Sequence, residues 1–518
     1  MKNQNWLPQF TNEIITNARA RSNGLLDSYL IALEGWRRGL TLTWYSEKVK
    51  NNSVHAPGRL FTLSSSYKTH EFYKTTGDKV SKESLKLTGN KDLAKELFSK
   101  HGVPVPAGKR FKKDIQNEEI IFYANKLGFP LVLKPTNGYQ GKGVIANIRD
   151  INHLRDSLIH VREVLNYPDV LIEQYIPGEE YRVFVVEDNV VAAINRIPAN
   201  IVGDGVNTVK ELIKIKNKER KKNPRLYSCL INIDYEVKSF VERSGLTFED
   251  VPEEGERIFL RQNSNISTGG DSVDVLEELS DDIKQIAINS LKAMPELPHG
   301  GVDIIVNTNK NLKYTAYVLE INAIPQIGSL VFPMVGHARN VPAAIIDYYF
   351  PETKNNKNYN PKIYFDFKSI LEPLRSKEVQ EVVVTPAPLQ PTFAIKYTIE
   401  GKVQDVGYRR WIRKIALESD LYGFAKNLSD GNVDVVVAGE KETVEGFKQI
   451  CLEGSKNSKV TNVTGVIWNK PIKVGFEIKA NQKRKSKKKT NVNEKVTRIG
   501  KMKMLIRRIL KRNDFKFK

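Results

Sequence analysis

Two apolar segments near the middle of the chain carry oxygen-bearing side chains at regular positions. Residues 301–306 read Gly-Val-Asp-Ile-Ile-Val, and residues 318–322 read Val-Leu-Glu-Ile-Asn. Both patterns are typical of buried strands, where a carboxylate is rarely tolerated without a partner. If the two strands are neighbours, Asp303, Glu320 and Asn322 converge on one face. Such a set of hard oxygen ligands suits Mg²⁺, with Mn²⁺ as an alternative, and a structural ion pair is the competing explanation.

Helical and strand-like patterns alternate around these segments, between residues 86 and 350. Apolar residues at a spacing of three to four from Leu93 to Phe98 predict a helix that ends at His101-Gly102, whereas residues 210–223 are merely polar and Lys-rich. The order predicts two α+β lobes rather than a doubly wound sheet. Further helices are expected at 25–38, 117–127 and 280–294, and strands at 40–45, 130–134, 143–148, 170–173, 182–187, 190–194, 301–306 and 316–321.

A glycine-rich loop follows the strand that ends at Lys134. It reads Pro-Thr-Asn-Gly-Tyr-Gln-Gly-Lys-Gly, which includes Gly138, Gly141 and Gly143. One ammonium group and several backbone N–H groups in such a loop can hold a phosphate chain. The loop is neither a Walker A motif nor a Rossmann fingerprint, and a plain hairpin loop explains it equally well.

The segment 173–180, Glu-Gln-Tyr-Ile-Pro-Gly-Glu-Glu, places an acid at the end of an apolar strand and a second acid after a turn. Backbone groups in such a segment can face an adenine edge, while a carboxylate accepts hydrogen bonds from ribose hydroxyls. The alternative is a strand-to-turn edge with solvated acids.

In this order the three features resemble the ATP-grasp superfamily over roughly residues 86–340. Residues 196–213 and 260–270 are similar to the ligase modules of cyanophycin synthetases and of bifunctional glutathione-synthesis enzymes. The resemblance implies an ATP-grasp domain at 86–350 that uses ATP and magnesium. The implied contacts are Lys91, Lys134, Gly138, Gly141 and Gly143 with the phosphates, Glu173, Tyr175 and Ile176 with adenine, Glu180 with ribose, and Asp303, Glu320 and Asn322 with magnesium.

The chemistry that the resemblance implies is activation of a carboxylate by the γ-phosphate of ATP, followed by attack of an amine on the acylphosphate. Arginines hold the acylphosphate and the oxyanion that follows. Arg261 and Arg196 are the candidates, Arg182 is a weaker third, and surface ion pairs are the alternative. The other catalytic half of the glutathione and cyanophycin enzymes is missing, and residues 1–85 are short for the lobe that precedes an ATP-grasp core. The substrates, an amino acid or peptide and a carboxylate, are therefore not identified.

Residues 351–391 are rich in Pro and Asn and are expected to be a linker. The segment 392–479 reads strand, loop, helix, strand, strand, helix, strand, which is the pattern of a ferredoxin-like fold. Its loop at 401–409, Gly-Lys-Val-Gln-Asp-Val-Gly-Tyr-Arg, can offer N–H groups and a guanidinium group to an anion. Asn427 supplies a side-chain amide that could orient a water molecule.

These paired motifs look like those of the acylphosphatase family across nearly all of residues 392–479. The resemblance assigns Arg409 to the phosphate and Asn427 to the attacking water, with no need for a metal. Asp405 stands where the family usually has Gly, and Tyr408 stands where Phe is usual. Because an acid beside an anion site weakens phosphate binding unless it faces outward, a binding or regulatory module is the alternative.

Charge is concentrated in a basic tail at 480–518. The chain has 81 Lys+Arg and 60 Asp+Glu, a net charge of +21, and residues 481–518 alone carry 16 basic and two acidic residues. The rest is close to an ordinary soluble protein, so no specific nucleic acid is predicted as a partner. A basic amphipathic helix in the tail would suit an anionic membrane surface or an acidic partner, with docking on the protein's own body as an alternative. Its apolar face would hold Ile499, Met502, Leu505, Ile506, Ile509 and Leu510.

The two cysteines, Cys229 and Cys451, are too few for a disulfide scaffold, and no apolar run of signal-peptide or membrane-spanning type is present. These features predict a cytoplasmic protein, with peripheral membrane binding through the tail as an extension.

Three functions compete. The first is an ATP- and Mg²⁺-dependent carboxylate–amine ligase with an attached acylphosphatase-like domain, which would edit or turn over acylphosphates that the ligase makes. The second is an acylphosphatase whose ATP-grasp part binds nucleotide or supplies the substrate. The third is a nucleotide-sensing scaffold without catalysis, against which the full set of phosphate and magnesium positions argues.

Overall fold

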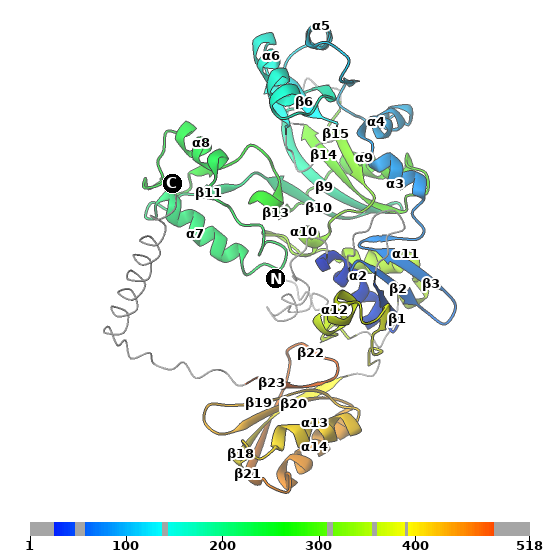
Figure 1. Cartoon of the computed structure of the whole chain (residues 1–518), viewed down its shortest axis with the longest axis vertical. Helices are drawn as coiled ribbons and strands as arrows, with labels where there is room; N and C mark the ends of the chain where they lie inside the picture. The colour runs from blue at the N-terminus through cyan, green and yellow to red at the C-terminus, as the bar shows by residue number, and fades with distance from the viewer. Residues whose placement is uncertain are drawn as a thin grey trace, which may run out of the picture. The chain divides into compact units, whose positions relative to one another are not determined.

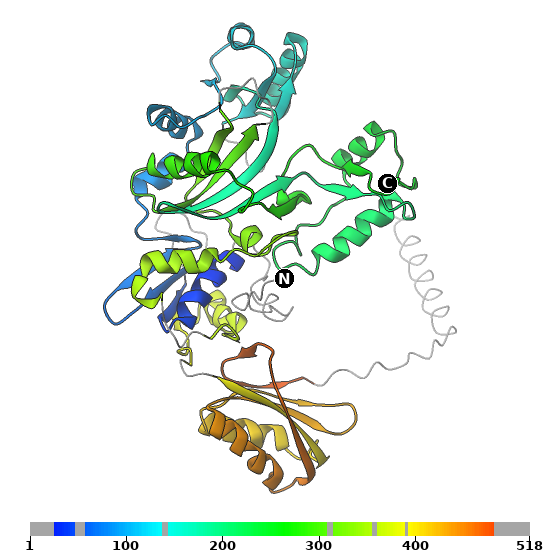
Figure 2. The ribbon, with the colours of Figure 1, turned by 180° about the vertical axis from the view of Figure 1, so that it is seen from behind.

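The computed structural model describes residues 25–46, 57–136, 143–307, 314–354, 360–388 and 392–480. They form two compact units (Figures 1 and 2). The first unit contains the residues up to Phe393 together with 438–441 and 469–475, and the second contains the rest. No helix within these ranges is long and apolar enough to span a membrane.

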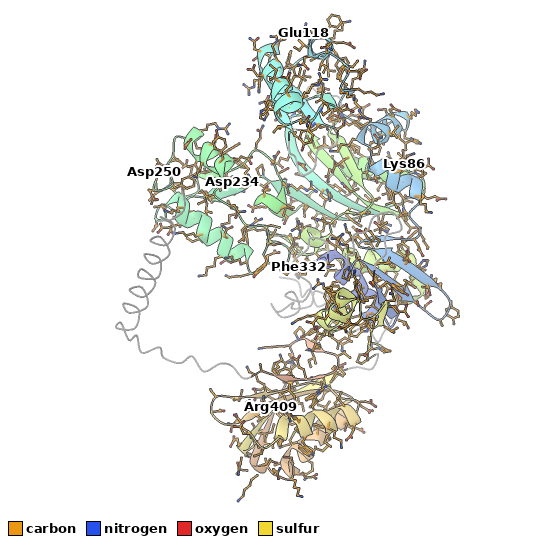
Figure 3. The ribbon with its side chains drawn as sticks, viewed as in Figure 1. Lys86, Glu118, Asp234, Asp250, Phe332 and Arg409 are labelled. Carbon is orange, nitrogen blue, oxygen red and sulfur yellow. The ribbon has the colours of Figure 1, made fainter. Side chains whose placement is uncertain are left out.

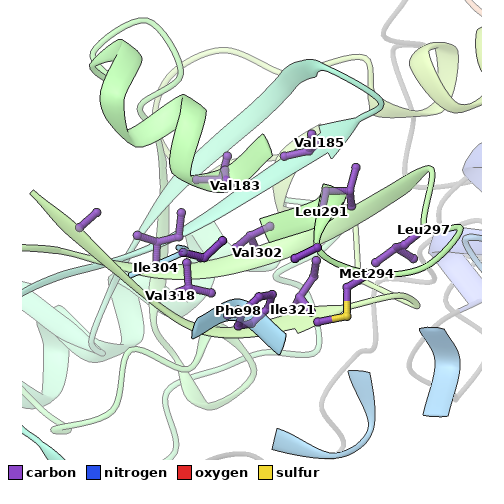
Figure 4. Close-up of a cluster of buried hydrophobic side chains, with 14 of the residues drawn as sticks. Phe98, Val183, Val185, Leu291, Met294, Leu297, Val302, Ile304, Val318 and Ile321 are labelled. Atoms are coloured by element: carbon purple, nitrogen blue, oxygen red, sulfur yellow. The ribbon is translucent and has the colours of Figure 1, made fainter. Parts of the chain in front are cut away.

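The first unit is built on a central antiparallel sheet. Side chains alternate along its strands, so Val183 and Val185 share one side with Val302 and Ile304. Helix α9 (Asp281–Lys292) covers this side and forms a core with it (Figure 4). The residues of opposite parity point to the other face, which is therefore free to carry polar groups. The strands lie in the order β13 (Asp271–Asp274), β10 (Asn189–Ile197), β9 (Gly178–Val186), β14 (His299–Asn307) and β15 (Ala316–Asn322).

A four-stranded sheet forms a smaller lobe, at the top of Figure 1. Leu131, Leu133 and Ile172 of its strands pack against Ile120 and Leu158 of two helices, α5 (Asn117–Leu127) and α6 (Ile151–Ile159). Helix α4 (Lys91–Lys100) precedes this lobe in the chain and contacts β15. The strand order is β5 (Gly108–Phe111), β8 (Val170–Gln174), β6 (Leu131–Pro135) and β7 (Ile145–Ile148).

Residues 360–388, inside the segment that was expected to be a linker, are folded into the first unit, which corrects that part of the sequence-based expectation. Helix α12 (Phe367–Ser376) starts after the N-cap Asp366, and the ring of Phe367 packs against Trp44 and Tyr29. Strand β17 (Glu381–Val383) pairs with β1 (Thr41–Tyr45) and completes the N-terminal sheet. The prolines and asparagines at the two ends of the segment suggested a linker, although the apolar residues of α12 between them are buried. The other elements are β2 (Leu60–Ser64), β3 (Thr69–Tyr73), β4 (Thr76–Gly77), α2 (Leu25–Arg37) and α11 (Val341–Tyr349).

Helix α7 (Val209–Arg220) occupies most of the Lys-rich stretch for which the sequence analysis predicted no helix. Thr208 and Glu211 form a capping box at its start. Val209, Leu212 and Ile213 are buried together with Arg220, and the lysines of the helix outnumber these apolar residues. Its core partners come from the ribbon of β11 (Asn200–Val202) and β12 (Arg257–Phe259) and from α8 (Tyr235–Arg243).

The second unit has one mixed sheet with helices α13 (Tyr408–Glu418) and α14 (Lys441–Glu453). Its order of strands and helices agrees with the expected ferredoxin-like pattern, and one further strand, β23, pairs in parallel with β19. The strands lie in the order β21 (Lys459–Ile467), β18 (Phe393–Lys402), β20 (Val433–Gly439), β19 (Tyr422–Asn427) and β23 (Phe476–Lys479).

The predicted helices at 25–38, 117–127 and 280–294 are confirmed, and so is the helix predicted from the apolar spacing at Leu93–Phe98, which spans Lys91–Lys100. The predicted strands of the central sheet and the smaller lobe are also confirmed, with ends shifted by a few residues. Gly138, Gly141 and the basic tail at 481–518 lie outside the described residues.

Candidate functional site

Charged side chains occupy the face of the central sheet opposite α9. The register sets Arg182 beside Asp303 and sets Arg196 beside Glu180. Arg182 donates from Nη2 to Asp303 Oδ2 over 2.8 Å, and its Nε contacts the other carboxylate oxygen. Arg196 Nη1 donates to Glu180 Oε1 over 2.7 Å and to Asp303 Oδ2 over 3.2 Å. Two guanidinium groups therefore share one buried carboxylate.

Asp303 is the centre of this group and is only 3% exposed. Burial acts to raise its pKa, but the attraction of Arg182 and Arg196 outweighs burial and lowers the pKa of Asp303 to about 2. On the adjacent strand Glu320 is the direct cross-strand neighbour of Asp303, and Asn322 donates from Nδ2 to Glu320 Oε1 over 3.2 Å. The three predicted metal ligands thus lie together on two paired strands.

A second charged cluster lies where the smaller lobe meets α4. Glu173 of β8 is buried, and its two carboxylate oxygens contact the ammonium groups of Lys134 on β6 and Lys95 on α4. Lys91, one helical turn before Lys95, lies with its Nζ 3.3 Å from Glu320 Oε2. Since Glu320 belongs to the central sheet, this contact joins the two clusters into one site.

The environment of Lys134 disfavours its charged form. Burial, followed by repulsion from Lys91, lowers the pKa of Lys134 to about 7, although Glu320 and Asp92 attract its ammonium group. Burial and repulsion from Lys134 also lower the pKa of Lys95 well below its ordinary value. An anionic ligand would relieve the repulsion in this cluster.

The second unit contains a loop that precedes a helix and ends in an arginine. Asp405 has a φ of 58° and Gly407 a φ of 79°, and Gly407 is the N-cap of α13. A left-handed residue at position 405 explains why Gly suits it, and Asp is among the residues that tolerate this conformation. The Tyr408 ring is buried, and its hydroxyl donates to the Cys451 carbonyl over 2.8 Å, so Tyr replaces Phe here without leaving a buried hydroxyl unpaired.

Asn427, at the end of β19, is buried, and neither polar atom of its side chain has a hydrogen-bond partner in the described part of the chain. Gln404 donates to the carbonyls of Leu428 and Asn432, which fixes the loop beside this strand end. Arg409 (Figure 3) donates over 3.4 Å to the carbonyl of Lys479, the cross-strand neighbour of the residue before Asn427. The loop at 401–409 therefore ends in Arg409, and through Gln404 it also contacts the segment that follows Asn427.

Two family models match the chain. Residues 88–221 match the RimK-like ATP-grasp domain, and residues 395–504 match acylphosphatase. The chain combines a RimK-like ATP-grasp domain with an acylphosphatase domain.

The ATP-grasp domain accounts for the similarity to curated proteins. The chain is 35% identical over 273 residues to the glutathione biosynthesis bifunctional protein GshAB of Enterococcus faecalis, which covers 51% of this chain and 35% of that protein. It is 32% identical over 289 residues to a cyanophycin synthetase of Nostoc, covering 55% of this chain and 31% of that protein. The chain therefore spans about a third of the length of these relatives.

For the acylphosphatase domain, a solved acylphosphatase from Coxiella burnetii is 33% identical and covers 17% of this chain and 93% of that chain, with a TM-score of 0.17.

Four of the residues predicted to contact ATP lie with the charged clusters. Lys91, Lys134 and Glu173 form one cluster, which meets Glu320 and Asp303. Glu180 is held by Arg196 and contacts Ser264. Their roles toward ATP and metal stay predictions. Of the three loop glycines, only Gly143 is described, and it has a φ of 77°.

Some backbone groups at the strand end that was predicted to face adenine are already hydrogen-bonded within the protein. The Tyr175 N–H donates to the Pro130 carbonyl over 3.0 Å, and the Gln174 N–H donates to the Ala107 carbonyl over 2.8 Å. Ile176 is buried. The Tyr175 N–H is therefore already paired, and its predicted contact with adenine would have to use another group.

Arg261 of the ATP-grasp domain belongs to a different ion-pair group from Asp303. Its Nη atoms contact Asp234 and Glu236 at the start of α8, and its Nε donates to the Thr268 carbonyl over 3.1 Å (Figure 3 labels Asp234). Nevertheless Ser264, three residues further on, contacts Glu180. The loop that carries Arg261 therefore reaches the charged face, whereas the Arg261 side chain is anchored away from it.

Lys95 is a site residue that the sequence analysis missed. It follows Lys91 by four residues, so both lie on one side of α4, next to the buried side chains of Ala94 and Phe98. The repeated lysine was the available signal. Its significance appears only when β8 brings Glu173 beside it.

We predict that nucleotide binding to the ATP-grasp domain weakens as the pH rises through about 7. Below that pH Lys134 carries the proton that a phosphate needs, and above it the ammonium group is lost. The dissociation constant of ADP, measured by calorimetry between pH 6 and 8.5, should rise about tenfold, the contribution of one charge-assisted hydrogen bond. The Lys134→Arg variant stays protonated throughout and should show a flat profile. Equal slopes in both proteins would contradict the assignment.

Proposed function

We propose that the chain is an ATP- and divalent-metal-dependent ligase that joins a carboxylate to an amine through an acylphosphate. The observation that carries this proposal is the contact between Lys91 and Glu320. It joins a lysine cluster suited to phosphates with a pair of carboxylates suited to a metal ion. Neither cluster alone would distinguish catalysis from a structural ion pair.

The donor set fits a hard divalent cation. Glu320 and Asn322 are partly exposed, and Oδ1 of Asp303, which contacts Nε of Arg182, keeps a second lone pair, whereas Oδ2 accepts from both arginines. Mg²⁺, the cation that we propose, would neutralise the phosphate charge when bound. The protein supplies two carboxylates and one amide, so oxygens of the nucleotide would complete the shell.

Residues of the chain itself bind the phosphates and the substrate carboxylate. Lys134 and Lys91 bind the phosphates of ATP, and Arg182 and Arg196 hold the substrate carboxylate on the charged face. One oxygen of that carboxylate forms a bond to the γ-phosphorus as ADP leaves. The amine nitrogen next attacks the acyl carbon, the bond to phosphate breaks, and the nitrogen loses a proton to solvent, so that an amide and inorganic phosphate are released.

The relatives named for glutathione biosynthesis and cyanophycin synthesis suggest an amino acid or peptide as substrate. Cys229 and Cys451 are buried and form no disulfide bond, which supports a cytoplasmic location. Binding of an anionic membrane surface or an acidic partner by the basic tail stays a prediction from its charge.

The test of ligation is ADP release by the full chain with ATP, Mg²⁺, and pairs of amino acids and short peptides. Glu320→Gln should lower the stimulated rate about 100-fold, the usual cost of removing one electrostatic contact in a transition state. Asp303 is a poorer choice, because its loss leaves the buried Arg182 without its carboxylate and leaves Arg196 with Glu180 alone. The matched control is Glu118→Gln on an exposed helix (Figure 3). Stimulated ADP release that survives Glu320→Gln would reject the proposed site.

A second activity, hydrolysis of acylphosphates, is favoured by Asn427. A buried amide with no hydrogen-bond partner lowers stability unless something binds it, and a water attacking a phosphate held by Arg409 would do so. The attacking oxygen bonds to phosphorus, the phosphorus–acyl oxygen bond breaks, and a carboxylate and phosphate result. Acting on the ligase intermediate, this reaction would consume ATP without forming product.

Asn427→Ala should lower acetyl phosphate hydrolysis by about 100-fold and leave the melting temperature unchanged or raised, since it removes two unpaired polar atoms. Asn462→Ala, on the exposed edge strand β21, is the control. In the ligation assay, Arg409→Ala should use less ATP per amide formed than the wild type. Unchanged acetyl phosphate hydrolysis in Asn427→Ala would count against the acylphosphatase activity. Identical ATP use per amide in Arg409→Ala and the wild type would count against coupling of that activity to ligation.

A further inference from the structure

Arg225 lies between α7 and α8, with its guanidinium group against neutral partners. Nη1 donates to Cys229 Sγ over 2.7 Å. Nη2 donates to Gln326 Oε1 over 2.9 Å and to Ser267 Oγ over 3.4 Å. A thiol, an amide oxygen and a hydroxyl satisfy its hydrogen-bonding groups without supplying negative charge.

Other arginines around the charged face are paired differently. Each contacts at least one carboxylate: Arg182 and Arg196 contact Asp303, Arg220 contacts Asp271, and Arg339 contacts Asp274. Arg225 has neutral hydrogen-bond partners, although the carboxyl group of Asp27 nearby attracts it. Because an arginine stays protonated, one without a direct carboxylate contact keeps more attraction for a further anion than one in a direct ion pair. Arg225 is therefore suited to an anion that arrives from solution.

The loop that follows Asn322 connects Arg225 to the charged face. Gly301 leaves room for Pro325 and Arg182, whose nearest atoms would lie 2.9 and 3.0 Å from a Cβ at that position. At Gly328 a Cβ would lie 2.8 Å from Cδ of Arg225. One short loop thus passes near Arg182 at Pro325 and near Arg225 at Gly328.

The N-terminal region holds this loop in place. Thr75 and Thr76 donate from their hydroxyls to the carbonyls of Pro325 and Ala323, over 2.9 and 2.5 Å. The buried carboxylate of Asp27 accepts from the N–H groups of Ile327 and Gly328, over 3.0 and 2.9 Å. Burial raises the pKa of Asp27, and the attraction of Arg225 opposes that rise. Gln326, one of the partners of Arg225, therefore lies on a segment that is held from both sides.

We propose that Arg225, together with Gln326 and Ser267, binds the carboxylate of an amino acid that serves as the amine substrate. This inference rests on the proposed ligase function and narrows the amine to one that carries its own carboxylate. Arg182 and Arg196 hold the acylphosphate, and Arg225 holds the far end of the attacking molecule. The amino group then lies between them, directed at the acyl carbon.

The test is equilibrium binding of the twenty free amino acids, and of their carboxamides, to the full chain in the presence of ADP and Mg²⁺, measured by calorimetry. At least one amino acid should bind, and its carboxamide should bind about tenfold or more weakly. Arg225→Met should weaken binding of the free acid to the same degree and leave the carboxamide unchanged, so that the variant no longer distinguishes the two ligands. Arg243→Met, which removes an exposed arginine stacked on Phe240, is the matched control.

A second variant guards against misfolding. Gln326 is exposed, and Gln326→Glu places a carboxylate of the same shape beside Arg225, where it should compete with the ligand and raise its dissociation constant about tenfold. An unchanged preference for acid over amide in both variants would overturn the proposal, as would the absence of any amino acid binding while ADP binds. Failure of the wild type to bind ADP would instead count against the proposed ligase function itself.

Discussion

The carboxylate of Asp303, shared between Arg182 and Arg196, is the interaction on which the first unit depends. It lies on a strand whose alternate residues, Val302 and Ile304, belong to the main core. Removing one member of a buried ion pair typically costs about 3–5 kcal/mol, because the remaining charge stays buried. The charged face and the core therefore constrain the same strand register, and a slip of one residue would destroy both.

The site draws on parts of the chain that are far apart in sequence. The smaller lobe supplies Lys134 and Glu173, α4 supplies Lys91 and Lys95, and the central sheet supplies the carboxylates. Within the described residues 25–46 and 57–85, the N-terminal region contributes no charged group to this cluster, yet its hydrogen bonds fix the loop after Asn322. A region without evident chemistry in its sequence thus positions Gln326, one of the residues that we assign to the second substrate.

The predictable parts of the site were those that a local pattern fixes. Alternation along a strand sets which way Asp303 and Glu320 point, so their convergence followed once the strands were taken as neighbours. Lys95 and Arg225 could not be found this way, because their partners Glu173 and Gln326 are distant in sequence. The prediction of a linker was wrong at α12 for a related reason. This helix is stabilised by packing on the N-terminal region rather than by its own composition.

The most direct measurement is a crystal structure of the chain with a non-hydrolysable ATP analogue and Mn²⁺, in which anomalous scattering locates the metal. The account predicts a metal peak at about 2.1–2.2 Å from an oxygen of Glu320, as expected for a small divalent cation, with the phosphates against Lys134 and Lys91. A nucleotide bound elsewhere, or a metal with no contact to Glu320, Asn322 or Asp303, would contradict the assignment of this face as the catalytic site.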